Sequence, residues 1–359
     1  MHKRIEWKYI EQRLLKAQIP ATSRDEIISK LLHIDRLKKE KQIILLAHYY
    51  QILPIQLIAY ICGDSLFLAK AYQTIGSAKI ILSSTVYFMA EMVKLFNPEK
   101  KVIIPDLEAS CSIAMGMNAS VIKKLKSEFP SSAIVTYVNS TLEVKACSDV
   151  ICTSANAKNI ITKIAGNPVI VLPDHYLAEN IISEIPEKSR YLIYRRIEKE
   201  HIVLYKPLDQ KEIFIPLQNT LSPELSRGVC VVHDNFEPRN IEYLKNYHHV
   251  DLVLAHPEVR PEVAKQADMI GGTSKMIDFV KSSSAKKILY LSECDLAVPL
   301  IEAYPDREFI TPCFICPYMK KNTLDNVIHC LENETHEVTI DQTLAQKAKT
   351  AFDRMFELS

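Results

Sequence analysis

The sequence IILLAHYYQILPIQLIAYICGDSL spans residues 43–66 and contains the pattern from which the fold class follows. An apolar run at 43–47 ends in the polar cluster His-Tyr-Tyr-Gln, and a second apolar stretch leads into Gly-Asp-Ser before a helical segment. Apolar runs separated by helices are typical of parallel strands that are buried on both faces of a sheet. The stretch therefore predicts an α/β fold with polar groups gathered at the carboxyl ends of its strands.

This pattern recurs three times along the chain. Further apolar runs lie at 80–82, 102–105, 134–138, 150–152, 169–172, 229–232, 252–255, 269–270, 288–291 and 309–310. Equal steps of 15 residues join the pairs Tyr50 and Ser65, Asn139 and Ser154, and Glu258 and Thr273. The next strand ends follow 19 residues later, at Ser84, Pro173 and Ser292. Repeated spacing of this kind predicts three α/β/α sandwich domains related by pseudo-threefold symmetry, each with a short parallel sheet, around a central site.

The same pattern gives expected domain boundaries. We expect N-terminal helices over 1–40, α/β repeats over 41–122, 123–233 and 234–321, and a C-terminal helical segment over 322–359. The middle repeat carries an insertion at about 184–223 that is rich in charge and proline. Apolar periodicity predicts a helix over 24–41 with Thr22 or Ser23 as its N-cap. After a helix that starts near Thr323, we expect an extended piece at 336–340 and a last helix at 341–358.

Composition narrows the class of protein. The 359 residues carry 44 Lys and Arg against 43 Asp and Glu, and this balance argues against nucleic acid or a membrane surface as the main partner. Apolar runs fall well short of the ~20 residues that a membrane helix needs, and the charged N-terminus lacks the apolar core of a signal peptide. Nine cysteines in such a chain favour a reducing cytoplasm, with metal binding or catalysis rather than disulfides.

Three cysteines, Cys111, Cys230 and Cys316, lie in or just after an apolar run, one in each repeat. Three converging thiolates and a vacant position suit an iron–sulfur cluster with one open iron, which can act as a Lewis acid on a substrate oxygen. Zinc is an alternative, with Cys313 and Cys316 as a local pair, although structural zinc prefers four closed ligands. A non-enzymatic iron–sulfur sensor is a further alternative, but the many polar groups at the strand ends exceed what a sensor needs.

Those polar groups fall into two sets. The first set opens helices just after strands, where free N–H groups and the helix dipole favour anions, and consists of Ser65, Ser154 and Thr273. The second set can shuttle protons around a cavity and consists of His48, Tyr50, Tyr137, Asn139, His233, His256 and Glu258. Together they predict a pocket for a small polyanion that carries carboxylate or phosphate groups.

Several motifs that contain these residues resemble those of the quinolinate synthase (NadA) family. The matching motifs include Leu-Ala-His-Tyr-Tyr-Gln (46–51), Pro-Asp-Leu-Glu-Ala-Ser-Cys-Ser (105–112), Tyr-Val-Asn-Ser (137–140), Cys-Val-Val-His (230–233), Ala-His-Pro-Glu (255–258) and Cys-Pro-Tyr-Met-Lys (316–320). The resemblance runs from about residue 30 to the C-terminus, and many short motifs in one order make it specific.

The resemblance implies an enzyme that condenses iminoaspartate with dihydroxyacetone phosphate. The products would be quinolinate, phosphate and water, in de novo NAD biosynthesis, with a functional link to L-aspartate oxidase. It implies a 4Fe–4S cluster held by Cys111, Cys230 and Cys316. It also implies that iminoaspartate is bound by His48, Ser65, Tyr137, Asn139, Ser154, His256, Glu258 and Thr273. Tyr50 and Glu258 would transfer protons, with His233 nearby.

The chain departs from the family pattern at a few positions. Tyr49, Ser110 and Val259 stand where the family usually has Asn, Gly and Cys. Gly272 stands where it usually has Ser, so we expect weaker substrate binding there. None of these changes removes a cluster ligand, and we expect activity to be retained. A redox switch formed by Cys313 and Cys316, which would strip the cluster of a ligand, is a further hypothesis.

Overall fold

The computed structural model describes residues 6–17, 19–76, 78–217 and 227–359, so the end of the predicted insertion, 218–223, lies outside the described residues. The chain divides into two compact units. The first comprises Met1–Ser110, Glu293–Glu308 and Cys313–Ile340. The second comprises Cys111–Ser292, Phe309–Pro312 and Asp341–Ser359. The boundaries predicted at residues 122, 233 and 321 stay predictions.

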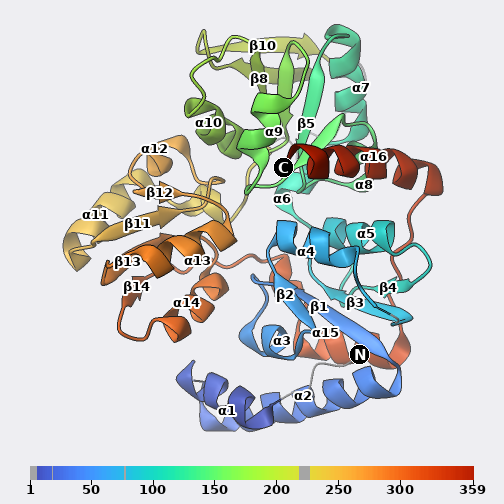
Figure 1. Cartoon of the computed structure of the whole chain (residues 1–359), viewed down its shortest axis with the longest axis vertical. Helices are drawn as coiled ribbons and strands as arrows, with labels where there is room; N and C mark the ends of the chain where they lie inside the picture. Colours follow the sequence, from blue (N-terminus) through green and yellow to red (C-terminus); the bar gives the residue numbers. More distant parts are fainter. Residues whose placement is uncertain (1–5, 18, 77, 218–226) are drawn as a thin grey trace. The chain divides into compact units, whose positions relative to one another are not determined.

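Three sheets share one strand order, and this confirms the predicted α/β fold class (Figure 1). In the first unit the order is β2-β1-β3-β4. Its strands are β1 (Ile43–His48), β2 (Ile61–Gly63), β3 (Ile80–Ser84) and β4 (Lys101–Ile103), and all their pairings are parallel. Strand β1 is buried along its whole length, as its unbroken apolar run predicts.

The second sheet repeats this order and then extends it. Its parallel strands run in the order β6-β5-β7-β8, with bounds β5 (Ala133–Tyr137), β6 (Val150–Cys152), β7 (Val169–Leu172) and β8 (Tyr191–Glu198). The insertion then adds two antiparallel strands, β9 (His201–Lys206) and β10 (Lys211–Pro216). The charged insertion is therefore a sheet extension.

The third sheet has the order β12-β11-β13-β14. Its strands are β11 (Leu252–Ala255), β12 (Met269–Ile270), β13 (Lys287–Leu291) and β14 (Glu308–Ile310). Strand β11 pairs in parallel with both β12 and β13. Since β1, β5 and β11 hold the same place in their sheets, the residues that follow them occupy equivalent positions.

Helices of the first unit surround its sheet. They are α1 (Trp7–Lys16), α2 (Ala21–Glu40), α3 (Leu53–Ile58), α4 (Ser65–Tyr72), α5 (Tyr87–Phe96), α14 (Ala297–Ala303) and α15 (Leu324–Asn333), with short 3-10 turns η3 (Cys294–Leu296) and η4 (Met319–Lys321). Helix α2 packs against α15 (Figure 1). The predicted N-cap of α2 was wrong, because Pro20 precedes the helix and its carbonyl accepts the first helical bond, from the amide of Arg24.

Helices of the second unit cover its two sheets. They are α6 (Ser112–Met115), α7 (Ala119–Glu128), α8 (Leu142–Ala146), α9 (Ala157–Lys163), α10 (His175–Ser183), α11 (Pro238–His248), α12 (Pro261–Ala264), α13 (Thr273–Ser282) and α16 (Gln342–Leu358), with the 3-10 turn η2 (His233–Asn235). Helix α16 packs against α8 and β6 (Figure 1). Asp341 caps it by accepting a hydrogen bond from the amide of Leu344, as expected for a helix start.

One predicted strand, at 229–232, is wrong, because these residues form a loop that leads into η2. The hydroxyl of Ser112 explains the loop. It donates to the carbonyl oxygen of Val229 over 2.9 Å and accepts from the amide of Val231 over 3.1 Å. A side chain therefore satisfies backbone groups that a strand would pair with its neighbour.

The predicted extended piece at 336–340 pairs in part with β4 and its next residue, because the amide of Val338 donates to the carbonyl of Val102 and the amide of Ile104 to that of His336. Among the described residues, no helix is both long enough and apolar enough to cross a membrane.

Candidate functional site

Strands β1 and β11 end in the same local arrangement, one in each unit. After β1, the backbone amide of Tyr50 donates to Nδ1 of His48 over 3.1 Å. After β11, the amide of Glu258 donates to Nδ1 of His256 over 3.4 Å. In both cases the amide two residues later orients an imidazole at the carboxyl end of a central strand. This shared geometry is what the repeat in the sequence predicts for equivalent residues.

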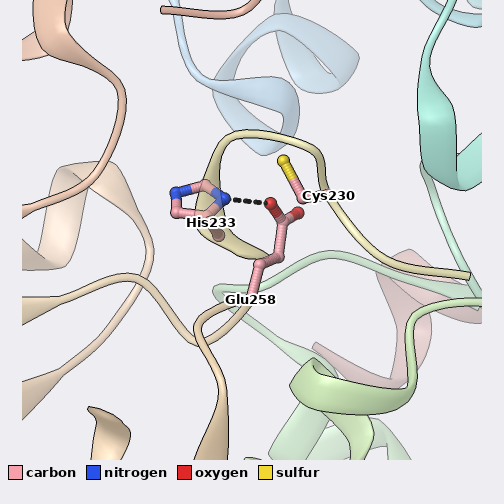
Figure 2. Close-up of side chains that lie close together, drawn as sticks. All are labelled: Cys230, His233 and Glu258. Atoms are coloured by element: carbon pink, nitrogen blue, oxygen red, sulfur yellow. Dashed lines mark ion pairs between the residues drawn. The ribbon is translucent and has the colours of Figure 1, made fainter. Parts of the chain in front are cut away.

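A cluster of polar side chains in the second unit surrounds the carboxylate of Glu258, a residue that is 3% exposed. The phenol of Tyr137, at the end of β5, donates to Oε1 of Glu258 over 2.6 Å. On the other carboxylate oxygen, Nδ1 of His233 lies 2.8 Å away and Nδ1 of His256 3.6 Å away (Figure 2 shows the His233 contact). Four predicted site residues from three parts of the chain therefore meet at one carboxylate.

Burial and charge set the protonation state of this carboxylate. Burial acts to raise the pKa of Glu258, but the imidazoles of His256 and His233 and the phenol of Tyr137 outweigh it and hold the pKa below its usual range. The rings of His233 and His256 stack, with centroids 4.6 Å apart and an angle of 16° between their planes. Glu258 is thus an ionised carboxylate at neutral pH, as a general base must be.

A second buried carboxyl, that of Asp174, interacts electrostatically with Glu258. Asp174 was not among the predicted site residues. Its Oδ1 caps helix α10 by accepting from the amide of Leu177 over 2.9 Å, and its Oδ2 has no hydrogen-bond partner among the described residues. Burial raises the pKa of Asp174 well above its usual range, and the charge of Glu258 raises it further. Burial and charge therefore shift the pKa values of the two carboxyls in opposite directions, upward for Asp174 and downward for Glu258. Its signal in the sequence was the strand-end cluster Leu-Pro-Asp at 172–174.

Cys230 adds a thiol to the same place. Ligand atoms of Cys230, His233 and Glu258 all lie within 4.8 Å of one another, in the part of the chain that the structure describes (Figure 2). A thiol, an imidazole and a carboxylate at this separation are a donor set that a metal ion accepts. The metal-binding role predicted for Cys230 therefore has local chemistry to support it.

Cys111 and Cys230, both in the second unit, belong to segments that are tied together. Ser112 directly follows Cys111, and its hydroxyl holds the backbone of both residues that flank Cys230. Close packing of Gly228 fixes the start of the same loop, since a Cβ atom at this position would lie 1.9 Å from the carbonyl oxygen of Pro173. Neither cysteine takes part in a disulfide.

Two of the three segments predicted to bind anions lie close together in the second unit. A Cβ atom added to Gly272 would lie 2.8 Å from Oγ of Ser154, so the junctions of the second and third repeats face each other. Thr273, the first residue of α13, is buried beside them. Nearby in sequence to Tyr137, the buried side-chain oxygen Oδ1 of Asn139 has no hydrogen-bond partner among the described residues, which leaves it suited to a ligand.

In the first unit, a lysine joins the predicted site residues. Nζ of Lys320 donates to the backbone carbonyl of Tyr50 and lies 2.8 Å from Oε1 of the fully buried Glu293. The same Oε1 accepts from the amide of Cys316 over 3.2 Å. Lys320 and Glu293 thus hold the backbone of Tyr50 and of Cys316, two of the predicted site residues. No role was assigned to Lys320 or Glu293 from the sequence, although Glu293 lies in a polar cluster at a strand end and Lys320 in a family motif. Ser65, also predicted, is the first residue of α4, whose N-cap is Asp64.

The bonding of the cysteines near Cys316 differs from the prediction. Cys294 and Cys313 form a disulfide, with Cα atoms 4.9 Å apart. This pairing is incompatible with a zinc site built on Cys313 and Cys316, and with a direct disulfide between these two. Cys316 itself is not in a disulfide. Burial raises the pKa of its thiol, although the backbone amides of Met319 and Tyr318 oppose this effect. A bound metal would reverse it, because a metal deprotonates a coordinating thiol.

The family model described as quinolinate synthetase A protein (NadA) matches residues 32–357. The chain belongs to this family.

Named members of the family cover most of the chain. It is 39% identical to quinolinate synthase 2 of Mesorhizobium japonicum over 321 residues, which are 89% of this chain and 88% of the relative. It is 37% identical to the quinolinate synthase of Agrobacterium fabrum, over 90% of this chain and 84% of that protein. It is 35% identical to the enzyme of the same name from Caldicellulosiruptor bescii, over 90% of this chain and 97% of that protein.

Proposed function

We propose that this chain is a quinolinate synthase, which condenses iminoaspartate with dihydroxyacetone phosphate to give quinolinate, phosphate and water in de novo NAD biosynthesis. Family membership supports the reaction, and one structural observation supports the assignment of this reaction to the site around Glu258. The ionised, buried Glu258 is surrounded by Tyr137, His233 and His256. Such a cluster suits a reaction that removes protons from carbon and adds them to departing oxygen.

A 4Fe–4S cluster held by Cys111, Cys230 and Cys316 is part of this proposal. The three thiols fit such a group, because none is in a disulfide and each is half-buried, Cys111 at the N-cap of α6 and the other two in loops. Ser112 holds the segments of Cys111 and Cys230 together, and Glu293 holds the backbone of Cys316. When bound, the cluster supplies an open iron that acts as a Lewis acid toward a substrate oxygen.

Iminoaspartate carries two carboxylates, so its site needs hydrogen-bond donors and little negative charge. We assign this binding to His48, Ser65, Tyr137, Asn139, Ser154, His256, Glu258 and Thr273. The open geometry at Gly272 leaves the hydroxyl of Ser154 in place beside the start of α13, where backbone N–H groups favour anions. The unpartnered oxygen of Asn139 is suited to accept a hydrogen bond from the imine nitrogen or a hydroxyl of the second substrate.

Proton transfer is assigned to Glu258, His233 and Tyr50. Glu258 removes the proton, because its carboxylate stays ionised at neutral pH. His233 contacts this carboxylate through Nδ1 and holds its position. Tyr50 lies beside His48, with the two rings edge to face and their centroids 4.6 Å apart. We assign its phenol to proton exchange with substrate.

A metal-dependent hydrolase or lyase that holds one zinc ion is the second candidate. The three donors Cys230, His233 and Glu258 favour it, since catalytic zinc sites use three protein ligands and an open position. In that case Cys111 and Cys316 would have no role in metal binding, so the two functions differ in which substitutions remove the metal.

Metal analysis separates the two functions. Anaerobically purified chain should contain about four irons and four sulfides per molecule under the cluster assignment, and substitution of Cys111, Cys230 or Cys316 by Ser should remove most of them. Cys147→Ser changes a thiol outside the predicted ligand set and serves as the control. Zinc in place of iron, retained in Cys111→Ser and Cys316→Ser but lost in Cys230→Ser, would overturn the cluster assignment in favour of the hydrolase or lyase.

A cytoplasmic location and the functional link to L-aspartate oxidase belong to the same proposal. Iminoaspartate is an imine that water hydrolyses, so the enzyme that makes it must act close to the enzyme that consumes it. Quinolinate formation from L-aspartate and dihydroxyacetone phosphate in a mixture of the two enzymes, compared with pre-formed iminoaspartate that has aged in buffer, measures this dependence.

A further inference from the structure

The turn that carries Glu258, just after β11, is bonded to a side chain from another part of the second unit. Within the turn, the amide of Val259 donates to the carbonyl of His256 over 3.1 Å. Nδ2 of Asn180, in helix α10, donates to the carbonyls of Pro257 over 2.9 Å and Val259 over 2.8 Å. Asn180 is 5% exposed. One side-chain amide therefore bridges the residues on both sides of the proposed base.

The middle peptide group of this turn is fixed from both of its sides. It consists of the carbonyl of Pro257 and the amide of Glu258. The carbonyl accepts from Asn180, and the amide donates to Nδ1 of His256 over 3.4 Å. The two common types of β-turn differ chiefly in the orientation of this peptide group, and its rotation redirects the residue that follows it. The bond from Asn180 therefore opposes a rotation that would turn the carboxylate of Glu258 away from its partners.

The turn after β1, in the first unit, is held in the same way. The amide of Gln51 donates to the carbonyl of His48 over 3.0 Å. Nε2 of Gln56, in helix α3, donates to the carbonyls of Tyr49 over 2.8 Å and Gln51 over 2.7 Å, and these two residues flank Tyr50. One arrangement thus holds both residues that are proposed to exchange protons with substrate.

The donor is present in each repeat, although the chain supplies it from different places. Six residues after Tyr50, Asn139 and Glu258 stand Gln56, Lys145 and Ala264. Nζ of the fully buried Lys145 donates to the carbonyl of Ser140, the residue that follows Asn139. Ala264 has no side-chain donor, and in the third repeat the bonds come from Asn180 instead, because α10 packs against α12. A bond that is kept while its donor changes position indicates that the bond itself has a role.

We propose that Asn180 and Gln56 are positioning residues that hold the turns of Glu258 and Tyr50 in the orientation that proton transfer requires. Their role rests on the proposed function of Glu258 and Tyr50. A side-chain amide suits it, because one NH₂ group carries two N–H donors and can bond two carbonyls at once. Neither Asn180 nor Gln56 was among the predicted site residues.

Kinetics of cluster-loaded Asn180→Leu test this role. Leucine is of similar size but donates no hydrogen bond, so both carbonyls lose their partner. We expect kcat to fall about 10- to 100-fold with iron content at the wild-type level, because a small misplacement of a reacting group costs rate on this scale. Gln56→Leu should lower kcat in the same way through Tyr50. Asn180→Ala removes the same donor with a smaller side chain and replaces Asn180→Leu if that variant fails to fold.

Asn97→Leu is the matched control. Asn97 is 4% exposed, and its Nδ2 also bridges two carbonyls, those of Tyr72 over 2.8 Å and Val93 over 3.1 Å. None of these three is a predicted site residue. Asn97→Leu should lower the midpoint of urea unfolding about as much as Asn180→Leu does and leave kcat unchanged. An equal fall of kcat in the two variants would trace the effect to lost stability and would overturn the positioning role.

A structural arm makes the result independent of the assigned reaction. Crystal structures of cluster-loaded wild type and Asn180→Leu would show the peptide group between Pro257 and Glu258. We expect it to rotate in the variant, so that the amide of Glu258 no longer faces Nδ1 of His256. An unchanged turn, or a wild-type kcat in the variant, would overturn the positioning role of Asn180. A wild type that forms no quinolinate, together with a turn that rotates in the variant, would overturn the proposed function alone.

Discussion

The hydroxyl oxygen of Ser154 lies 2.8 Å from the point that a Cβ atom on Gly272 would occupy. A glycine at 272 therefore leaves room for the hydroxyl of Ser154, a predicted substrate-binding group from the neighbouring repeat. The expectation that Gly272 weakens binding through a missing hydroxyl stays a prediction. A larger side chain at 272 would also require Ser154 to shift, which is an opposing effect.

Gly272→Ala should accordingly raise the KM for iminoaspartate. The added methyl group forces Ser154 to rotate, and a hydrogen bond to a charged group contributes about 1.5–3 kcal/mol, so we expect a rise of about tenfold or more. Steady-state kinetics measure this. Gly76→Ala is the matched control, because a Cβ atom there would meet nothing within 4 Å. An unchanged KM in Gly272→Ala would contradict the role of Ser154.

Glu258→Gln should abolish most of the activity and leave the fold intact. The amide keeps the size of the side chain but cannot remove a proton, and general base catalysis contributes about 100- to 10,000-fold to rate. We expect a fall in kcat within that range, with iron content at the wild-type level. The exposed Glu262, on the nearby helix α12, provides a matched control in Glu262→Gln. Retained activity in Glu258→Gln would exclude it as the base.

Lys320→Met should destabilise the first unit. Lys320 is the partner of the fully buried Glu293, and the loss of one member of a buried ion pair costs about 3–5 kcal/mol. Urea unfolding measures the loss. The adjacent Lys321 pairs with the exposed Glu108, so Lys321→Met removes a lysine from the same turn with little effect. Equal stability of the two variants would show that the Lys320–Glu293 pair does not hold this turn.

Asp174→Asn should become relatively more stable than the wild type as the pH rises. The pKa of Asp174 is raised in the folded chain, so its protonated form favours folding at low pH. This contribution is lost as the pH rises from about 4, the usual pKa of an aspartate in an unfolded chain, through the folded pKa. Asparagine caps helices well and does not titrate, so it avoids this loss.

Urea unfolding at pH 5 and pH 8 compares Asp174→Asn with the wild type. Asp341→Asn, at the start of α16, makes the same change at an exposed helix cap and accounts for the loss of a capping carboxylate. A stability difference between Asp174→Asn and the wild type that is the same at both pH values would contradict a raised pKa for Asp174.

Much of the fold was predictable because the central strands are unbroken apolar runs. Strands β1, β5 and β11 could be placed from their apolar runs, and the equal steps of 15 residues that begin at Tyr50, Asn139 and Glu258 marked their ends as equivalent. Strands β8–β10 were missed because charged residues interrupt and flank their short buried runs, such as the one that contains Leu204. The loop around Cys230 was predicted as a strand because its sequence is apolar. The sequence does not reveal that the hydroxyl of Ser112, distant in sequence, forms hydrogen bonds with the backbone of this loop.

The candidate site was likewise predictable only in part. Polar clusters at the ends of apolar runs predicted that Tyr137, His256 and Glu258 occupy strand ends, and Tyr137 and Glu258 are in fact hydrogen-bonded. Contacts made by groups without a periodic signal could not be found in this way. The Cys294–Cys313 disulfide and the bonds from Asn180 to the turn of Glu258 each join segments whose proximity is decided by tertiary packing.

Formation of quinolinate is the most direct measurement. Anaerobically purified, cluster-loaded chain would be mixed with iminoaspartate and dihydroxyacetone phosphate, and quinolinate would be quantified by its mass and absorbance. We predict multiple turnovers by the wild type and by Cys147→Ser, no more than background in Cys230→Ser, and turnover at least about 100-fold slower in Glu258→Gln. An iron-loaded wild type that forms no quinolinate, or equal turnover in Cys230→Ser, would contradict the assignment of this chain as a quinolinate synthase with its cluster on Cys230.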